Sequence, residues 1–202
     1  MALISVSNNA LQNITAVPAS VASGALILLS TQTASSSASI EFTSGIDSTY
    51  DSYVFKFINI HSSADSGVGF YFNGSTDGGS NYNVTKTTTF FRTYHNEADT
   101  LTTLSYETGD DLAQSTADQA LIVGLGNQND ENAVGTLQIF NPSSTTFVKH
   151  FISTGQLNNN GDFSVESFVA GYFNTTSAIN AVKFYLSSAN IDDGIIKMYG
   201  VK

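Results

Sequence analysis

The chain contains no cysteine, no tryptophan and only two prolines among its 202 residues. The absence of cysteine excludes disulfides, thiolate metal sites and cysteine nucleophiles, and it fits a protein assembled in a reducing cytoplasm. Runs rich in Leu, Glu and Lys, which are typical of helices, are also missing, whereas 14 Phe and 9 Tyr are present. This composition favours strands, because aromatic side chains fit pleated, half-buried surfaces.

Positive charge is scarce as well. Seven Lys and Arg stand against 17 Asp and Glu, giving a formal net charge of -10 and a pI near 4.3. Such a surface repels phosphate backbones and anionic lipid, so we expect neither nucleic acid nor a membrane as a partner. The N-terminus has no basic leading region, and the apolar run 25–29 is far shorter than the ~20 residues of a membrane span. We therefore expect no signal peptide and no membrane insertion.

The chain divides into a short N-terminal segment and one long domain. Residues 1–24 are small, polar and uncharged, with isolated apolar positions, and we expect them to form an extended arm that serves in anchoring or assembly. From residue 25 to 202, short apolar runs alternate with turn-forming clusters of Gly, Asn, Asp and Ser. Strands are expected at residues 25–33, 38–43, 53–61, 67–73, 83–94, 101–106, 119–125, 133–140, 146–154, 163–173, 181–187 and 194–201.

Two of these strands are apolar on both faces. In YDSYVFKFINIH, Tyr53, Phe55 and Phe57 alternate with Val54, Ile58 and Ile60, which the period of two assigns to the opposite face. In DFSVESFVAGYF, Phe163 and Val165 fall on one face of the strand, and Phe168 and Tyr172 fall on the other. A strand in a simple two-layer sandwich needs only one apolar face, so something must cover the second. The strand AVKFYLSS, in contrast, shows ordinary inside-outside alternation.

The fold class that accounts for this pattern is all-β, an antiparallel β-sandwich resembling a jelly roll, with the extended N-terminal arm. No repeat at a fixed period is present, which argues against a propeller or a β-helix. One segment, TGDDLAQSTADQA at residues 108–120, fits either a short helix or a polar loop, because Asp110 and Asp111 would suit a first helical turn.

Residues capable of catalysis or metal binding are few. His61, His95 and His150 share no metal-ligand spacing, and strand histidines are usually structural. The Asn- and Asp-rich loops do not match a calcium-binding loop and are expected to be turns. Glu41 and Glu166 lie within predicted strands, so a glycosidase pair depends on their unknown separation. No cofactor motif is present, and we expect no enzyme, no cofactor and no metal.

Three segments resemble a known group of proteins. They are LLSTQTASSSASIEFTSGIDSTYDSYVFKFINIH (28–61), VGFYFNGSTDGGSNYN (68–83) and IIKMYGVK (195–202). They are similar to small virion structural proteins of marine tailed bacteriophages, cyanophages especially. The resemblance implies a non-enzymatic virion component, either a tail fibre or appendage or a protein that decorates the capsid. It implies no functional residues.

On this basis we expect a homotrimer in which a neighbouring copy or the N-terminal arm covers the second apolar faces. The arm is also expected to bind other virion proteins. The interface candidates are Val54, Ile58, Ile60, Phe168 and Tyr172. A monomer that covers the second face with its own loops or a short helix is the alternative. A second function, recognition of host surface glycans, would use exposed turn residues for stacking and hydrogen bonds. Its contact candidates are Asn81, Tyr82 and Asn83. A polysaccharide-degrading enzyme is a third reading.

Overall fold

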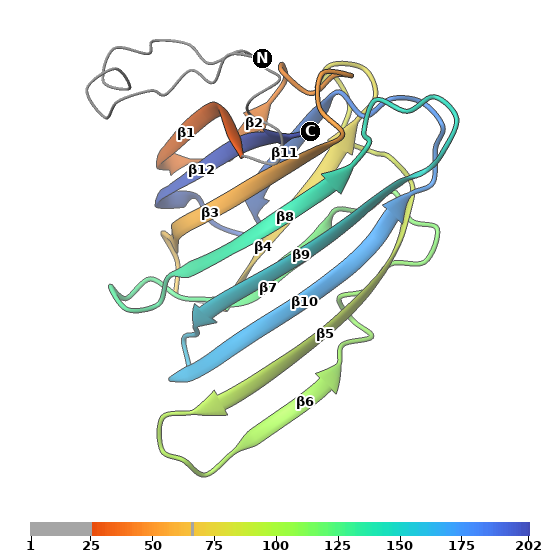
Figure 1. Cartoon of the computed structure of the whole chain (residues 1–202). Coiled ribbons are helices and arrows are strands. Elements are labelled where there is room, and N and C mark those ends of the chain that lie inside the picture. The colour runs from red at the N-terminus through yellow and green to blue at the C-terminus, as the bar shows by residue number, and fades with distance from the viewer. Residues whose placement is uncertain (1–25, 66) are drawn as a thin grey trace, which may run out of the picture.

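A computed structural model describes residues 26–65 and 67–202, which form twelve strands (Figure 1). The arm expected over residues 1–24 lies outside the described residues. The strands are β1 (Ile27–Ser37), β2 (Ser39–Phe42), β3 (Ser52–Ser62), β4 (Val68–Ser75), β5 (Lys86–Asn96), β6 (Thr102–Tyr106), β7 (Gln119–Leu125), β8 (Ala133–Phe140), β9 (Lys149–Asn158), β10 (Phe163–Phe173), β11 (Ala181–Leu186) and β12 (Ile191–Val201).

The strands build two antiparallel sheets that pack face to face. The larger sheet has eight strands in the order β1-β12-β3-β8-β9-β10-β5-β6, and the smaller has four in the order β2-β11-β4-β7. Figure 1 shows the larger sheet in front and the smaller behind it. The predicted all-β antiparallel sandwich is therefore confirmed. No helix in the described part of the chain is long and apolar enough to cross a membrane.

The connectivity is that of a hairpin rolled up on itself. With β5-β6 and β9-β10 set aside, the first strand pairs with the last (β1 with β12), the second with the seventh (β2 with β11), the third with the sixth (β3 with β8), and the fourth with the fifth (β4 with β7). This nested pairing is the jelly-roll arrangement, four strands in each sheet. The two remaining hairpins are insertions that continue the larger sheet past β8, which makes it twice as wide as the smaller one.

The segment that fitted either a helix or a polar loop forms a loop. Residues 108–118 connect β6 to β7 and run back along β5, where Lys86 and Ser115 exchange backbone hydrogen bonds of 2.8 and 3.0 Å. A further bond joins the Thr88 N–H to the Leu112 carbonyl at 2.8 Å. These bonds to a neighbouring strand satisfy backbone groups that a short helix would satisfy internally.

Phenylalanine rings fill the space between the sheets. Phe184 on β11 lies at the centre of the cluster and is fully buried. Its ring centroid is 5.3 to 6.4 Å from those of Phe42, Phe55, Phe57, Phe70 and Phe72. The rings come from both sheets, so this cluster holds the sandwich together. Edge-to-face and offset contacts of this kind add to the free energy gained from burial.

A β-bulge in β3 corrects one sequence prediction. Pairing between β3 and β8 shifts register between Phe57 and Ile60, and Asn59 adopts a left-handed backbone with φ 51°. An extra residue reverses the facing of every side chain after it. Ile60 consequently points into the core and is fully buried, so its prediction as an outer-face interface residue is wrong. Val54 and Ile58, which precede the bulge, keep the predicted face.

Candidate interaction surface on the eight-stranded sheet

Only one face of the eight-stranded sheet packs against the smaller sheet. The opposite face, termed here the outer face, is the one turned toward the viewer in Figure 1. Strand β9 shows the division directly, because its odd-numbered residues from Lys149 to Leu157 are buried while the even-numbered residues between them are exposed or half-buried. The outer face therefore presents a complete layer of side chains that the small sheet does not cover.

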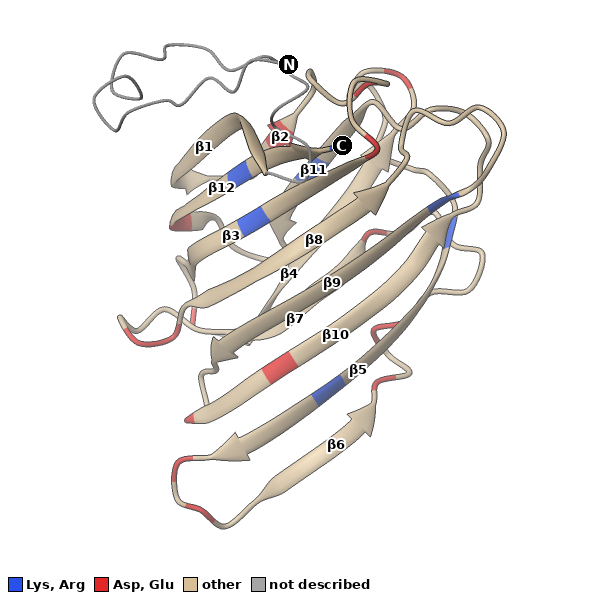
Figure 2. Ribbon diagram, viewed as in Figure 1, with Lys and Arg blue, Asp and Glu red and all other residues tan. Residues whose placement is uncertain are grey.

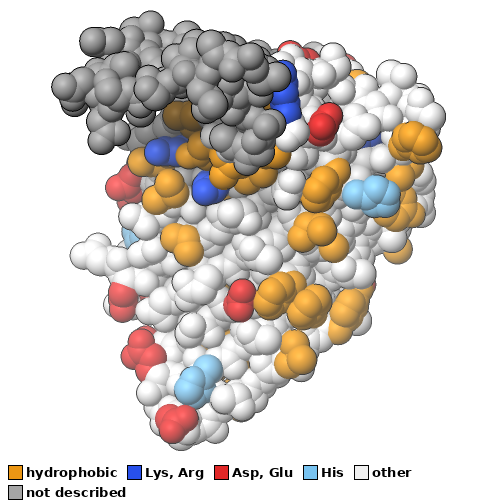
Figure 3. Space-filling view, in the orientation of Figure 1, with side chains coloured by type: hydrophobic (Ala, Val, Ile, Leu, Met, Phe, Trp, Pro, Cys, Tyr) orange, Lys and Arg blue, Asp and Glu red, His pale blue; other side chains and the backbone are white. Residues whose placement is uncertain are grey.

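Large apolar side chains lie on this face. Figure 3 shows them gathered over β10, β5 and β6. On β5, β6, β8 and β9 the most exposed, with their exposed fractions, are Leu104 (71%), Ile152 (53%), Tyr106 (51%), Phe91 (39%) and Val134 (39%). A group of neighbouring exposed apolar side chains, unlike scattered single ones, marks an interaction site.

Four of the five predicted interface residues belong to the outer face. Val54 and Ile58 lie on β3 and are half-buried, while Phe168 and Tyr172 lie on β10 among the apolar group. The Tyr172 ring centroid is 6.0 Å from that of His150, and its hydroxyl accepts a hydrogen bond of 3.4 Å from the Gln114 amide. The two-faced pattern of β3 and β10 thus reflects an apolar outer face as well as a core.

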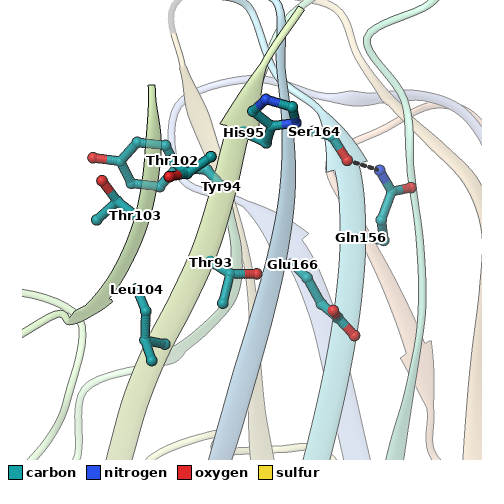
Figure 4. Close-up of a pocket in the computed structure, with 9 residues that line it drawn as sticks. All are labelled: Thr93, Tyr94, His95, Thr102, Thr103, Leu104, Gln156, Ser164 and Glu166. Atoms are coloured by element: carbon teal, nitrogen blue, oxygen red, sulfur yellow. Dashed lines mark hydrogen bonds between the residues drawn. The ribbon is translucent and has the colours of Figure 1, made fainter. Parts of the chain in front are cut away.

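A polar groove adjoins the apolar group. It has a volume of about 560 Å³ and lies across β9, β10, β5 and β6 (Figure 4). The outward side chains that line it are Thr93, His95, Thr102, Leu104, Gln156, Ser164 and Glu166. Figure 4 shows the Gln156 amide reaching Ser164, to whose hydroxyl it donates a hydrogen bond of 3.5 Å. Carboxylate, amide and hydroxyl groups in one groove suit a ligand rich in hydroxyls.

The two strand carboxylates considered for a glycosidase do not form a pair. Glu41 lies between the buried residues Ile40 and Phe42, so it faces away from the core on the small sheet. Glu166 lies between the buried residues Val165 and Ser167 and faces outward on the large sheet. The two side chains are on opposite surfaces of the sandwich and cannot flank one glycosidic bond.

The predicted glycan-contact residues lie beside the small sheet, on the other side of the sandwich from the groove. Asn81 and Asn83 are exposed, and the Asn81 amide donates a hydrogen bond of 2.7 Å to Asp77. The Tyr82 hydroxyl donates to Glu41 at 3.1 Å, and the Lys183 ammonium lies 5.0 Å from the centre of its ring. The Asn81 and Tyr82 side chains are already paired with groups of the same chain, which leaves less of them for a ligand.

Tyr82 belongs to a polar cluster on the outer side of the small sheet. The Tyr185 hydroxyl donates a hydrogen bond of 2.6 Å to Asp118, which also accepts one of 2.6 Å from the buried Asn73 amide. Lys183 lies 4.9 Å from the Tyr185 ring as well. Burial raises the pKa of both Tyr82 and Tyr185, with the nearby carboxylates adding to the effect. The cluster fastens loops and strands together rather than presenting free groups.

The three histidines lie in separate places. The His61 ring forms a hydrogen bond of 3.1 Å with the Gln128 carbonyl. His95, near the end of β5, lies 3.1 Å from the Asp99 carboxylate, and His150 lies beside Tyr172. His61 also lies 3.7 Å from Asp192. Within residues 26–65 and 67–202, no group of three or more His, Asp or Glu side chains is placed to hold a metal ion.

Two buried lysines were not singled out from the sequence. Lys86 begins β5 and Lys149 begins β9, and both are fully buried on the core face. The Lys86 ammonium donates a hydrogen bond of 2.6 Å to the Ala117 carbonyl, and that of Lys149 donates one of 3.1 Å to the Thr175 carbonyl. Burial lowers the pKa of Lys86 to about 8. The alternation Lys86, Thr88, Phe90 was the available signal, since it assigns Lys86 to the same face as a core phenylalanine.

A scan against protein-family models and searches of curated proteins and solved structures gave no match to this chain.

Proposed function

We propose that this chain is a non-enzymatic structural protein of a tailed-phage virion, exposed on the particle as a tail fibre or appendage component or as a capsid decoration. Its copies associate through the outer face of the eight-stranded sheet, in a homotrimer. The observation that carries the proposal is the apolar group on that face, around Ile152, Phe91 and Leu104. Jelly-roll domains occur in viral capsids, and the inserted hairpins widen the surface through which such a domain can associate.

The absence of cysteine and the low positive charge support the same role. A virion protein folds in the host cytoplasm and then works outside the cell, so its stability must come from packing and assembly rather than disulfides. Burial of a large apolar side chain contributes about 1.5 to 3 kcal/mol, so a few such residues repeated around a symmetry axis stabilise an oligomer without covalent links.

The first test is the solution mass of the full chain by light scattering across a concentration series. We expect a mass of three chains. A monomer at every concentration would contradict association through the outer face. The second test is mass spectrometry of purified virions, in which peptides of this chain should occur in many copies per particle. If the chain is made during infection but is missing from the particles, the virion assignment is wrong even where the protein oligomerises.

Glycan recognition is a second candidate function, favoured by the polar groove in Figure 4. Gln156, Ser164 and Glu166 offer hydrogen-bonding groups, and Phe168 follows Glu166 at the next outward position along β10, where a sugar ring could stack on it. A glycan array is the test. Binding that is lost in Glu166→Gln but kept in Tyr82→Phe would assign recognition to the groove, and the reverse pattern would assign it to the predicted turn residues. An array without any hit would leave only the structural role.

A further inference from the structure

Strand β6 differs from the other three strands that end a sheet. In β1 the pairing is interrupted by a bulge between Leu28 and Ser30, and Ser36 has a positive φ of 49°. β2 has only four residues, with Glu41 among them. On β7 the Gly124 carbonyl accepts a hydrogen bond of 3.2 Å from the Asn160 N–H. Bulges, short length, charge and covering bonds are the usual protections of a sheet edge.

Apart from its short length of five residues, β6 has none of these protections within the described structure. Its sequence is TTLSY, without charge or proline, and Figure 2 shows it uncoloured along its whole length. It pairs with β5 in continuous register from Thr102 to Tyr106. It is the last strand in the sheet order, so its second edge has no neighbouring strand among the described residues. An unprotected edge of this kind is a template for another strand.

The backbone groups at this edge can be assigned to particular residues. The Leu101 carbonyl accepts a bond from the Asn96 N–H at 3.2 Å, and the Glu107 N–H donates to the Phe90 carbonyl at 2.9 Å, so both residues face β5. Facing alternates along an antiparallel strand. Thr102, Leu104 and Tyr106 therefore direct their N–H and C=O groups toward the open edge. Their side chains lie on the outer face, where Leu104 and Tyr106 are among the most exposed apolar residues.

We propose that β6 pairs antiparallel with β6 of a second copy of this chain, across a twofold axis at Leu104. In this register Leu104 lies opposite Leu104 of the second copy and Thr102 lies opposite Tyr106. All three residues whose backbone groups face the open edge then form hydrogen bonds with the second copy. A twofold axis at position 103 or 105 would leave one of the three without such bonds. The contact is separate from the threefold association described above, and it goes beyond that proposal by joining copies edge to edge.

A second copy is the occupant that this edge fits, because β6 is complementary to itself. The twofold places Leu104 and Tyr106 of both copies in one apolar band that continues into Phe91 and Phe168, which stack beside them. It also places Glu107 opposite Leu101, so no like charges face each other along β6 and its two flanking residues although the chain carries -10. Isologous contacts of this type are the commonest between identical chains.

Single cysteines test the register, since the natural chain contains none. Facing Cα atoms in a hydrogen-bonded antiparallel pair are about 5.5 Å apart, a separation that a disulfide can bridge. Leu104→Cys should therefore cross-link with itself under mild oxidation. Thr102→Cys and Tyr106→Cys should each fail alone, because identical positions then lie four residues out of register, roughly 14 Å apart. An equimolar mixture of these two variants should cross-link.

The control is Phe147→Cys, in the loop between β8 and β9, because Phe147 has an exposed fraction of 69%, close to the 71% of Leu104. We expect Leu104→Cys to form dimers at least tenfold faster than this control at equal concentration. Equal rates would overturn the proposal. The proposal would also be overturned if Thr102→Cys alone cross-linked as fast as its mixture with Tyr106→Cys, because that result would mean that the copies associate in another register.

Light scattering separates this contact from the threefold one. A five-residue pairing buries less area than a standard interface and is therefore weak. The mass of the wild-type protein should consequently double as its concentration is raised. Thr102→Pro removes a backbone N–H at the open edge and leaves the apolar group of the outer face intact, so it should abolish that doubling, whereas Phe147→Lys should keep it. A trimer that persists in Thr102→Pro shows that the outer-face association survives the loss of the edge contact. An unchanged doubling in Thr102→Pro contradicts edge pairing.

Discussion

Phe91 on β5 and Phe168 on β10 stack face to face on the outer side of the sandwich, with ring centroids 4.8 Å apart and planes 11° apart. They are direct cross-strand partners, so the sheet itself sets their separation. Phe91 keeps 39% of its surface exposed. A stacked aromatic pair that remains partly open to solvent adds stability to the monomer and offers an apolar platform to a partner.

Replacing Phe168 should reduce both the stability of the monomer and its association, and each effect has its own measurement. Phe168→Ser removes the stacking, which is worth about 0.5 to 1.5 kcal/mol, and should lower the free energy of unfolding of the monomer by a similar amount. Because the apolar platform is also lost, we expect the oligomer to dissociate at higher protein concentration than the wild type does. Sedimentation velocity measures the second effect. Phe147→Ser, in a loop outside the sheet, should leave the association unchanged, and equal effects of both substitutions would argue against the platform.

Phe184→Ala should be among the most destabilising single changes. The ring contacts phenylalanines of both sheets, and its removal leaves a cavity that the surrounding β-structure cannot fill. We expect a loss of about 3 to 5 kcal/mol in urea-induced unfolding. Phe184→Leu, which keeps most of the volume, should cost considerably less. Similar losses for both variants would mean that the loss of stability does not depend on the size of the cavity, which would contradict close packing around Phe184.

The bulge in β3 predicts different effects for two substitutions at Asn59. A left-handed backbone costs a residue with a Cβ roughly 1 to 2 kcal/mol, asparagine less, and glycine nothing. Asn59→Val should therefore lower the free energy of unfolding by about 1 to 2 kcal/mol, while Asn59→Gly should change it little. Thermal unfolding of the two variants is the measurement. A Val variant as stable as the Gly variant would contradict the positive φ of 51°.

The pH dependence of stability should report on Lys86. Its pKa is lowered by burial to about 8 from the ordinary 10.5, so between these pH values the unfolded chain binds more protons than the folded one. The contribution of Lys86 to stability therefore rises with pH through this window, by about 3 kcal/mol in total, and the penalty of the buried charge is complete below pH 8.

Lys86→Met isolates this contribution. Urea unfolding of both proteins at pH 8 and pH 10.5 should show the wild type gaining stability relative to the variant. Deprotonation of tyrosines in the same range acts on both proteins and cancels in the difference. Parallel curves for the two proteins would show that Lys86 is not the group whose charge is suppressed by burial.

The turn at Asp77 gives a prediction about the predicted glycan residues. Hydrogen bonds from the Asn81 amide and from Ser75 lower the pKa of the Asp77 carboxyl to about 2. Asn81→Ala removes the largest of these causes, so an NMR titration should find the Asp77 pKa moved up toward its ordinary value of 3.8. Asn83→Ala, at an exposed neighbouring position, should leave it in place. An unchanged pKa in Asn81→Ala would mean that Asn81 is free for a ligand.

The sequence by itself determined the fold class and the approximate positions of all twelve strands. Alternation with a period of two is a local property, and it identified β10 as a strand with apolar side chains on both faces, Phe168 and Tyr172 among them. Turn-forming clusters marked the ends of the strands for the same reason, because a positive φ or a side-chain turn depends on a few adjacent residues.

Only the tertiary structure decided what depends on distant parts of the chain. The bulge at Asn59 moved Ile60 into the core, because β3 pairs with β8 on one side and with β12 on the other, and the register shifts here in both pairings. Strand order placed Glu41 and Glu166 on opposite surfaces and left β6 at a sheet edge. Long-range pairing fixes each of these, and no local pattern encodes which strands, far apart in sequence, become neighbours.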